Sequence, residues 1–309
     1  MPEEADLSRL KRLPIRERGN LVKASDFATL PGPGATVDEM LSSLPDILAG
    51  RQFRELVRKL RAVIDQGGGI ALAMGAHVVK CGLSPVVIDL VKRGIVTAAA
   101  MNGAAAIHDF EIALIGETSE NVDEELPAGR FGMAQETAAA FARASREARE
   151  AGKGLGEALG GLIVREQLGH RKYSILAACA EAGIPATVHV AIGADVVHMH
   201  PEADGADIGA ATLADFRKIC GVVKGLGNGA WLNVGSAVVL PEVFLKAVSV
   251  ARNLGADLDG MVTANFDMYD LYRPRTNVVN RPSGNGYQIM GRHEIMLPLL
   301  RLALISPAG

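Results

Sequence analysis

Short apolar runs alternate with segments of helical spacing along most of this chain. Five such runs cover residues 69–75, 95–100, 184–192, 229–232 and 258–262, and small or polar residues follow each of them. Strands buried on both faces of a sheet are nearly continuous apolar runs. Their alternation with helices indicates crossover connections and parallel pairing. The pattern therefore predicts an α/β fold in which a parallel β-sheet is flanked by helices.

The first part of the chain has a different pattern. Residues 1–50 are polar and contain the breakers Arg9–Pro14 and Pro31–Gly34. Thr36 and Glu39 have the spacing of a capping box, which predicts the start of a short helix. We therefore expect a polar arm with one short helix over residues 1–50. A single α/β ligand-binding domain is expected over residues 51–309.

Several helices are expected inside that domain. Apolar residues at helical spacing predict a helix over residues 53–64, before the first strand, and another at 295–305, which closes the core. Residues 136–152 predict an Ala-rich helix with a charged outer face, and residues 164–183 contain the helix that precedes the central strand. The acidic stretch 116–135 has the composition of a loop. The glycine clusters 152–156 and 225–229 are interpreted as turns, and Trp231 as a core residue.

Polar side chains lie at or just beyond the ends of the apolar runs. In parallel α/β sheets, ligands bind outside the carboxyl ends of the strands. Unrelated loop polarity is the alternative, but five polar strand ends favour one ligand crevice. We expect the following residues to meet at one edge of the sheet: His77, Asn102, Asp195, Asn233 and Asn265.

The segment 101–110 carries the first candidate chemistry. Asn102 and Gly103 end a strand and open a helix, so free backbone N–H groups and the helix dipole favour an anionic group there. His108 and Asp109 are candidate acid/base residues because histidine titrates near neutrality. Sequence neighbours in a helix point in different directions, so Asp109 could instead complement the helix N-terminus. His293 and Glu294, at the start of the last helix, are a second acid/base pair with the same alternative.

Composition excludes several classes of protein. The chain has 309 residues, 49% of them hydrophobic, and a formal net charge of −3 without a basic stripe, which argues against nucleic-acid binding. The three cysteines are scattered along the chain, so they indicate neither a disulfide framework nor a structural zinc site. This usage is typical of a protein in a reducing compartment. The acidic start does not have the pattern of a signal peptide, and no apolar run reaches about 18 residues. We expect a cytoplasmic protein that does not bind membranes.

A histidine cluster raises the question of a metal. His198 and His200 lie two residues apart, His189 precedes them, and aspartates lie nearby. In an extended segment this spacing puts two imidazoles on one face, where a carboxylate could complete a site for zinc, iron or manganese. The alternative is a polar loop with solvent-facing histidines. We favour that alternative and expect no bound metal.

Several segments resemble deoxyhypusine synthase and its bacterial relatives. The likeness runs from about Gly69 to Ile305, with gaps in the middle. It includes the helix, strand and Gly-rich turn in Gly82–Val96 and Asn102–Asp109, and the helix end Ala180–Pro185. The other matching segments are Arg252–Asp257, Thr263–Asp267 and Leu297–Leu300. Each piece is short, and the shared order makes the resemblance specific.

The resemblance implies a Rossmann-like, NAD-binding parallel-sheet fold and a homotetramer. That family uses NAD to oxidise spermidine and passes the aminobutyl group through an enzyme lysine to a lysine of a translation factor. The cofactor contacts that it implies here are His77, Asn102, Gly103, Asn233, Gly235, Ser236, Thr263 and Ala264. Together with the polar, aromatic cluster beyond the last run, it suggests Asn265, Asp267, Asp270, Arg273 and Arg281 as substrate contacts.

The departures from the family change the expected reaction. The family's catalytic lysine should lie near Val279–Pro282, but the last lysine of the chain is Lys246. An imine formed on a lysine is therefore not available at that position. The synthase also has Asp-Ala where this chain has Gly291–Glu294. In addition, Arg273, Arg275 and Arg281 suit an anionic group better than a polyamine.

The sequence thus predicts a deoxyhypusine synthase-like transferase or oxidoreductase. It would bind an NAD-type cofactor and act on a small amine, amino acid or anionic metabolite, without the lysine–imine route. One alternative is a metabolite-binding oligomer, dimeric or tetrameric, that has lost catalysis. Another is a metal-dependent hydrolase that uses His189, His198 and His200.

Overall fold

The computed structural model describes residues 2–306 and contains one sheet of six parallel strands. The strands are β1 (Ile70–Met74), β2 (Ala98–Asn102), β3 (Ala186–His189), β4 (Ala230–Val234), β5 (Val262–Asp267) and β6 (Gly286–Met290). Their order across the sheet is β3-β2-β1-β4-β5-β6. The predicted α/β fold with a parallel sheet is confirmed. This order reverses between β1 and β4, which defines the switch point of a doubly wound sheet.

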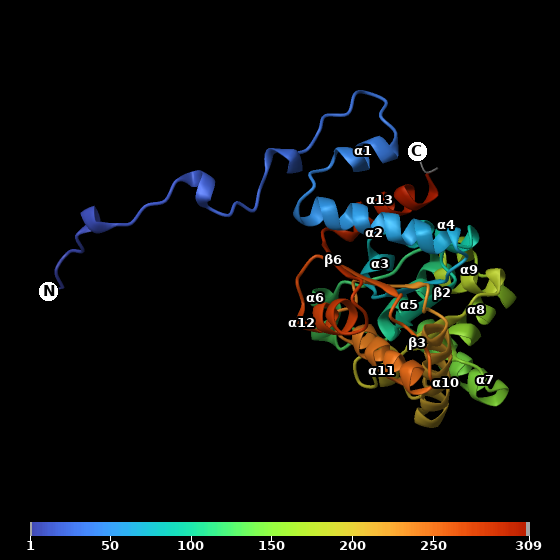
Figure 1. The fold of residues 1–309 in the computed structure, drawn as a ribbon. Helices are drawn as coiled ribbons and strands as arrows, with labels where there is room; N and C mark the ends of the chain where they lie inside the picture. Colours follow the sequence, from blue (N-terminus) through green and yellow to red (C-terminus); the bar gives the residue numbers. More distant parts are fainter. Residues whose placement is uncertain (1, 307–309) are drawn as a thin grey trace.

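Helices cover both faces of the sheet (Figure 1). Those before β3 are α1 (Val37–Ser43), α2 (Leu48–Asp65), α3 (His77–Lys80), α4 (Ser84–Lys92), α5 (Gly103–Ile115), α6 (Val122–Glu125), α7 (Gln135–Ala151), α8 (Leu155–Arg165) and α9 (Ile175–Ala182). After β3 come α10 (Gly205–Lys224), α11 (Val239–Asn253), α12 (Tyr272–Pro274) and α13 (His293–Ile305). A π-helix, η7 (Arg275–Asn280), connects α12 to β6. Short 3-10 turns are η1 (Leu7–Arg9), η2 (Ile15–Glu17), η3 (Ala24–Asp26), η4 (Leu126–Ala128), η5 (Arg171–Tyr173) and η6 (Val196–Met199).

Two hydrophobic cores lie on opposite faces of the sheet. The larger core joins α2, α4, α5, α8, α9 and α13 to one set of strand side chains, including Leu72, Met74 and Leu232. The smaller core lies under α10 and α11 and contains Ala71, Ala73 and Trp231. Side chains alternate between the two faces along each strand. Trp231 is fully buried and stacks on Phe244 of α11 at 4.3 Å between ring centroids, so its predicted core position is confirmed.

Strand boundaries differ from the predicted ones in both directions, since β1 and β3 end at Met74 and His189, before the predicted runs end. β2 continues to Asn102 and β4 to Val234, and β5 begins only at Val262, where the predicted run ends. The strands therefore include polar residues at their carboxyl ends, which an apolar run cannot signal. β6 was not predicted. It is an edge strand whose alternate residues are only partly buried, so it has no continuous apolar run.

Several local predictions can be compared with the structure. Thr36 caps α1, and both hydrogen bonds of the predicted capping box are present. The predicted helices at 53–64, 136–152 and 295–305 correspond to α2, α7 and α13. The segment 152–156 is not only a turn, because α8 begins at Leu155. The stretch 116–135 includes the short helix α6 as well as loop.

The N-terminal arm comprises residues 2–35. Residues 2–23 project away from the rest of the molecule (Figure 1), whereas Asp26 and Thr29 accept from and donate to the backbone of Asp46 and Ser43, respectively. Nearly all of its residues are exposed, and three 3-10 turns are its regular elements in the described range. The short helix α1 follows it and packs near α13. Throughout residues 2–306, no helix is both long and apolar enough to cross a membrane.

Candidate functional site

Two glycine turns meet at the switch point of the sheet. Gly75 follows β1 and donates its backbone N–H to the carbonyl of Val234 at the end of β4, at 3.0 Å. A Cβ on Gly75 would lie 2.2 Å from the carbonyl oxygen of Gly235, so no larger residue fits without a backbone shift. Gly235 itself has a φ of +63°, a conformation that favours glycine. These two turns bring the chain after β1 and the chain before α11 into direct contact.

His77 and His293 lie beside this junction. A Cβ on Gly235 would approach the His293 ring at 3.1 Å and the Cβ of His77 at 3.7 Å. The two imidazole rings are 5.9 Å apart between centroids. His77 is exposed, whereas His293 is buried. The Nε2 of His293 lies 3.3 Å from the carbonyl oxygen of Phe266, which can only accept, so this contact places the proton on Nε2. Nδ1 is then an acceptor, and it is buried with no partner in the described structure.

Glu294 and Cys81 form a second contact near these histidines. Burial, followed by the charge and the hydrogen bond of Glu294, raises the pKa of the Cys81 thiol. The thiol is therefore protonated at neutral pH and is a poor nucleophile. The structure thus brings His77, His293 and Glu294 together at one end of the sheet, a grouping that the sequence analysis did not predict. Cys81 was not among the predicted residues, and an isolated cysteine four residues after His77 gave no signal for it.

A row of amide side chains crosses three strands on the face covered by α11. Asn233, Asn265 and Gln288 lie opposite one another in the register of β4, β5 and β6. The Nδ2 of Asn233 donates to the Oδ1 of Asn265 at 2.7 Å, and the Nδ2 of Asn265 donates to the Oε1 of Gln288 at 3.2 Å. We call these three residues the amide ladder. Gln288 was missed in the sequence because β6 was missed.

Unpaired polar atoms accompany the amide ladder. The Oδ1 of Asn233, the Oγ1 of Thr263 and the Nε2 of Gln288 are buried and have no hydrogen-bond partner in the described structure. A buried polar atom without a partner costs about 1–3 kcal/mol. None of these groups is charged, so they suit a neutral ligand group with both donors and acceptors. Ala264, predicted beside Thr263, instead faces the larger core on the other side of the sheet.

The turn after β2 holds a carboxylate of the chain itself. The Oδ1 of Asn102 accepts a hydrogen bond from the backbone N–H of Ala105 at 2.9 Å and caps α5. A Cβ on Gly103 would lie 2.1 Å from the Oδ2 of Asp195, so this carboxylate lies against the start of α5. Burial raises the pKa of Asp195, which the hydrogen bond from Ala191 and the charge of His198 partly offset. An anionic ligand at this helix start would therefore lie beside a carboxyl group.

His108 and Asp109 do not pair with each other. The Nδ1 of His108 lies 2.6 Å from the Oγ1 of Thr118 and 3.7 Å from Glu111. Burial would raise the pKa of Glu111, but contacts with His108, Thr118 and Thr137 hold it below the ordinary value.

Asp109 has a separate set of partners in α9. It is fully buried and accepts hydrogen bonds from Ser174 Oγ, Ile175 N and Leu176 N at 2.6, 2.7 and 3.2 Å. Burial, only partly offset by these bonds, raises the pKa of Asp109 to about 6. Asp109 therefore holds the first turn of α9 rather than the N-terminus of its own helix.

The predicted substrate contacts beyond β5 are mostly engaged with other side chains of the chain. Arg273 pairs with Glu242 of α11 at 3.2 Å, and Asp270 pairs with Arg275 at 2.7 Å. Arg281 donates to Asn277 of η7 at 2.8 Å. Asp267 ends β5 and is buried, with its Oδ1 3.3 Å from the backbone nitrogen of Tyr269. These charges surround η7 and α11, next to the amide ladder.

The three histidines considered for a metal have separate surroundings. His189 is buried, contacts Thr187 Oγ1 at 3.0 Å, and has its pKa lowered to about 4 by burial. His200 lies 2.8 Å from the carbonyl oxygen of Gly132, whereas His198 lines a small apolar pocket with Phe141. Within residues 2–306, no group of three or more His, Cys, Asp or Glu residues could hold a metal ion. The hydrolase alternative therefore has no geometric support in this part of the chain.

Buried Asp215 is a further carboxylate that the sequence did not single out. Its Oδ2 accepts hydrogen bonds from the backbone N–H groups of Val188 and Gly156, at 2.8 and 3.0 Å. It thus joins α10 to β3 and to the start of α8. Burial raises the pKa of Asp215 to about 7, despite these bonds. A polar residue on a mostly apolar helix face was its only signal.

Comparisons with known proteins support the fold. No family model matches the chain, and no curated protein matches it. Among solved structures, a LOR/SDH protein from Methanococcus maripaludis S2 is similar at 18% identity and a TM-score of 0.51, over 96% of this chain and 75% of that one. The apo structure of ArgZ, an arginine dihydrolase from the ornithine-ammonia cycle in cyanobacteria, matches over 84% of this chain at 19% identity and a TM-score of 0.52.

A third similar structure is the ternary complex of AgrE with ornithine and NAD+. It matches over 85% of this chain at 17% identity, with a TM-score of 0.52. The chain spans only 33% of ArgZ and 34% of AgrE. At these identities the comparisons establish a shared fold.

Proposed function

We propose that this chain is a deoxyhypusine synthase-like enzyme that binds an NAD-type cofactor. It acts on a small amine, amino acid or anionic metabolite, without an imine on an enzyme lysine. The observation that carries the proposal is the contact of Gly75 with Gly235 at the switch point of the sheet. Dinucleotides bind doubly wound sheets at this point, where glycine lets the backbone approach the ligand.

The turn between β4 and α11 suits the pyrophosphate best. α11 has 15 residues, and Gly235 and Ser236 precede it. Its positive dipole end favours a phosphate. The Oγ of Ser236 already accepts a hydrogen bond from the backbone N–H of Leu240 at 3.2 Å and Pro241 has no N–H, so the proposed contacts are the Gly235 turn and the Ser236 hydroxyl rather than a row of free N–H groups. The start of α5 is less suitable because Asp195 lies against Gly103. In this proposal Gly75, His77, Gly235 and Ser236 contact the cofactor, which would supply a hydride acceptor.

The amide ladder suits a neutral part of the ligand. Its unpaired atoms include both acceptors and donors, and none is charged. A carboxamide or a hydroxyl-bearing group would satisfy such atoms, whereas a buried ionic group would leave its charge uncompensated. Thr263, Asn265 and Asp267 therefore stay in the proposed site, while Asn102 and Ala264 have structural surroundings.

Acid/base chemistry in the proposal is assigned to His293 and Glu294. Both lie at the start of α13, next to His77 and the Gly75–Gly235 junction. His108, paired with Glu111, is the second candidate, and Asp109 is better explained by its hydrogen bonds to α9. The lysine–imine route is omitted because Val279–Pro282 contains no lysine, and Lys246 pairs with Glu242.

The similar structures agree with this proposal, since AgrE was solved with ornithine and NAD+. The test is calorimetric titration of NAD+ into native protein and into His77→Ala. Because His77 is exposed, its loss should weaken NAD+ binding about tenfold, the value of one good hydrogen bond, without changing the melting temperature. The matched control is His170→Ala, an exposed histidine beside Gly116 at the far end of α5. Absence of any NAD+ binding by the native protein contradicts the proposal.

A metabolite-binding oligomer without catalysis is the second candidate. The missing lysine and the internal pairing of Arg273 favour it. Absorbance at the NADH band, measured with amines and amino acids as substrates, separates the two. NAD+ binding without reduction by any of them supports the second candidate, whereas reduction that is lost in His293→Gln supports the first.

A further inference from the structure

We propose that the N-terminal arm of one copy of this chain docks on an acidic segment of a second copy. The docking part of the arm is residues 7–23, called here the basic arm. Its receptor is residues 115–126, called here the acidic segment. The proposal concerns an interface and is independent of the cofactor.

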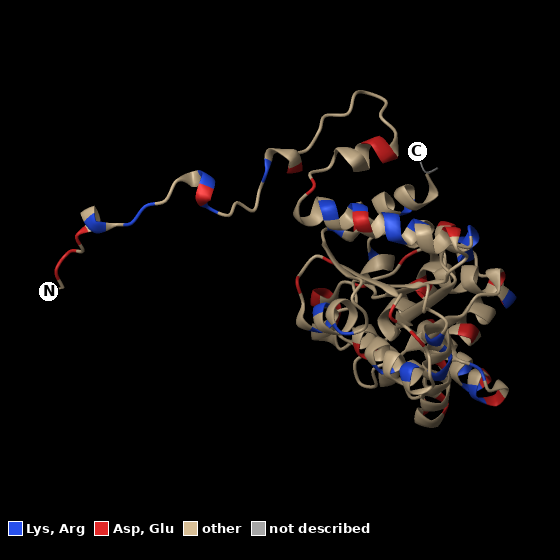
Figure 2. Cartoon of the chain, in the orientation of Figure 1, with Lys and Arg blue, Asp and Glu red and all other residues tan. Residues whose placement is uncertain are grey.

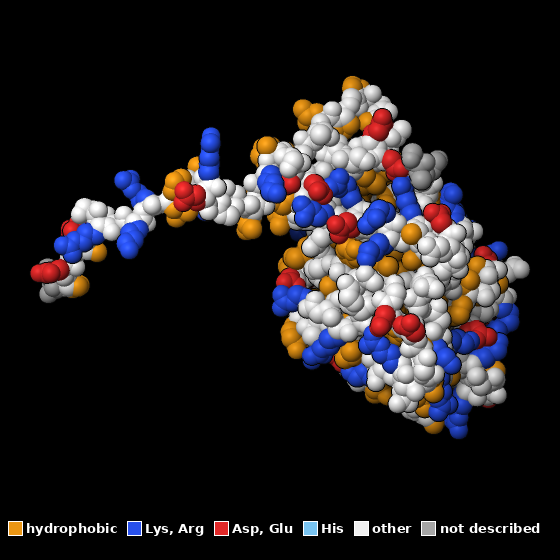
Figure 3. All heavy atoms as spheres, viewed as in Figure 1, with side chains coloured by type: hydrophobic (Ala, Val, Ile, Leu, Met, Phe, Trp, Pro, Cys, Tyr) orange, Lys and Arg blue, Asp and Glu red, His pale blue; other side chains and the backbone are white. Residues whose placement is uncertain are grey.

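The basic arm has the composition of a binding segment. It contains six Lys or Arg residues and one carboxylate, which gives a net charge of +5. Six large apolar side chains are exposed along it, and Leu21 is 95% exposed: Leu7, Leu10, Leu13, Ile15, Leu21 and Val22. Figure 3 shows apolar and cationic side chains interspersed along the arm. Large apolar side chains clustered on a surface mark an interaction site.

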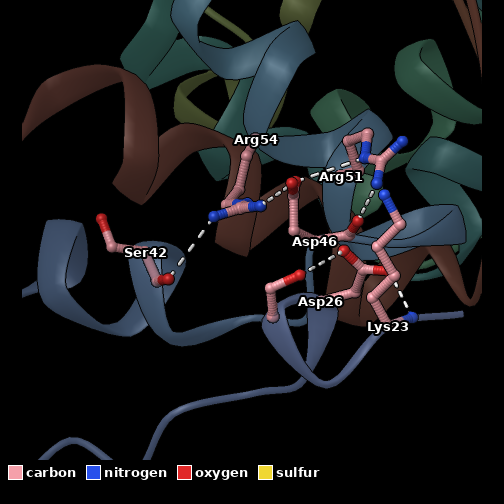
Figure 4. Close-up of polar contacts among 7 residues, drawn as sticks. Lys23, Asp26, Ser42, Asp46, Arg51 and Arg54 are labelled. Atoms are coloured by element: carbon pink, nitrogen blue, oxygen red, sulfur yellow. Dashed lines mark hydrogen bonds and ion pairs between the residues drawn. The ribbon is translucent and has the colours of Figure 1, made fainter.

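The arm is attached to the body just beyond residue 23 (Figure 4). The backbone N–H of Lys23 donates to the Oδ2 of Asp26 at 2.9 Å, and the carbonyl oxygen of Asp26 accepts from the backbone N–H of Asp46 at 2.9 Å. Arg51 and Arg54 hold Asp46 from α2. From residue 2 to residue 36, no residue belongs to or packs against the larger core. The basic arm is thus joined to a fixed point but adds nothing to the described core.

The acidic segment has the complementary properties. It contains five carboxylates and no Lys or Arg, so its net charge is −5. Ile115, Val122 and Leu126 are exposed large apolar residues within it, at 61%, 41% and 61%. Asp123, Glu124 and Glu117 are also exposed. Elsewhere the charges are more mixed, and Figure 2 shows both signs interspersed over the outer helices.

Charge and apolar surface therefore match between the two segments. The whole chain carries −3, so charges of +5 and −5 on two short stretches are a strong local separation. Seventeen extended residues span at most about 55 Å, ample to cross to a neighbouring molecule. In Figure 1 the arm extends away from its own α6. With two copies, each arm can reach the other's acidic segment, and this reciprocal exchange closes a two-fold dimer. Opposite charges would guide and orient the docking.

The experiment uses charge reversal in the full-length protein. One variant carries Arg9→Glu, Lys11→Glu and Arg12→Glu, a second carries Glu117→Lys, Asp123→Lys and Glu124→Lys, and a third combines all six. Sedimentation equilibrium measures the dissociation constant of self-association. Each triple variant should weaken it at least about tenfold, as expected from several charge pairs, and the combined variant should restore it. A salt concentration of about 1 M, where the screening length is near 3 Å, should abolish the difference.

Two further measurements test whether the basic arm docks on a second copy of the chain. A control that reverses three exposed cations elsewhere, Lys92→Glu, Arg217→Glu and Lys224→Glu, should leave the dissociation constant unchanged. Carbodiimide cross-linking of a mixture of ¹⁴N- and ¹⁵N-labelled protein should join Lys11 of one isotope to Glu124 of the other. Cross-links within single copies only would overturn the proposal in favour of docking on the chain's own body. Equal loss in both triple variants without restoration in the combined one would also overturn it, as would an arm that cross-links nowhere and binds anionic vesicles.

Discussion

Asn233 of β4 donates a hydrogen bond to Asn265 of β5 inside the sheet, at 2.7 Å between Nδ2 and Oδ1. Both side chains are fully buried. The parallel register places them directly opposite each other, and Gln288 continues the row on β6. Buried amides are normally hydrogen-bonded on all sides. The amide ladder instead ends in unpaired atoms, which is why it belongs to the proposed site.

Removing the middle of the amide ladder should be costly. Asn265→Ala leaves Asn233 Nδ2 with only the carbonyl of Ser236 and leaves Gln288 Oε1 without its donor. We expect a loss of about 1–3 kcal/mol in the free energy of unfolding, measured by urea denaturation. Asn233→Ala and the double variant complete a cycle, in which a coupling of at least about 0.5 kcal/mol is expected. Strict additivity would mean that the two amides do not interact.

Substitution at the switch point tests the close approach of the two turns. Gly75→Ala places a Cβ 2.2 Å from a backbone oxygen, so the turn must move. We expect a loss of about 1–3 kcal/mol in stability, as for other overpacked sites, together with loss of NAD+ binding. The control is Gly161→Ala in α8, where a Cβ meets nothing within 4 Å. Because alanine favours helix, this variant should be neutral or more stable by up to about 1 kcal/mol.

Asp215 should make stability depend on pH. Its pKa is about 7 in the folded chain because of burial, above the value of about 3.9 for an unfolded aspartate. A raised folded-state pKa gives a contribution that is present below pH 4 and is lost as pH rises through 7. Asp215→Asn does not titrate, and its amide oxygen can accept both N–H groups.

The variant should therefore match the native protein near pH 4 and become more stable than it by pH 8. The difference should grow by at most about 1.4 kcal/mol per pH unit. Urea denaturation at several pH values measures it. A constant difference across this range would show that the Asp215 carboxyl does not titrate there.

Asp109 should behave differently from Asp215 because both of its oxygens accept hydrogen bonds. In Asp109→Asn the amide nitrogen would meet a donor, either Ile175 N or the pair Ser174 Oγ and Leu176 N. We expect a loss of about 1–3 kcal/mol at pH 8, measured by thermal and urea denaturation. NAD+ affinity of the folded variant should be unchanged. Weakened NAD+ binding with unchanged stability would instead return Asp109 to the proposed catalytic set.

Metal removal tests the remaining alternative. His189 is held neutral in the core, and His198 and His200 have different neighbours. We expect a metal content well below one ion per chain by elemental analysis, and no change of melting temperature with a chelator. A bound ion that is lost in His198→Ala would support the hydrolase instead.

The parallel sheet could be predicted from sequence because buried parallel strands are apolar on both faces. β1 illustrates this, since every one of its five residues is buried and apolar. The carboxyl ends of β4 and β5 could not be located in the same way. Asn233 and Asn265 are polar residues inside the sheet, and only their partners on neighbouring strands make them compatible with burial. The structure places both residues within their strands, whereas the sequence suggested positions beyond the strand ends.

The candidate site could be predicted only in part. The meeting of strand ends follows from the fold class, and His77, which was predicted from it, lies beside Gly235 and His293 in the structure. Their role in a site stays a prediction. The role of Asp109 depends on Ile175, 66 residues further along the chain, and no local pattern reports such a contact. The same holds for Asp195, whose carboxylate lies against Gly103. Long-range partners decide whether a polar residue is structural or available to a ligand.

Because of its position, Trp231 is an intrinsic fluorescent probe of the sheet. It is the single tryptophan of the chain, it stacks on Phe244, and it lies two residues before Asn233 on β4. Its indole nitrogen is buried and has no hydrogen-bond partner among residues 2–306, and Trp231 lies opposite Thr263 in the strand register. Emission from this one fluorophore therefore reports the local polarity of the sheet beside the amide ladder. Entry of solvent or binding of a ligand there would shift the emission wavelength of Trp231 and change its intensity, so no added dye or label is needed.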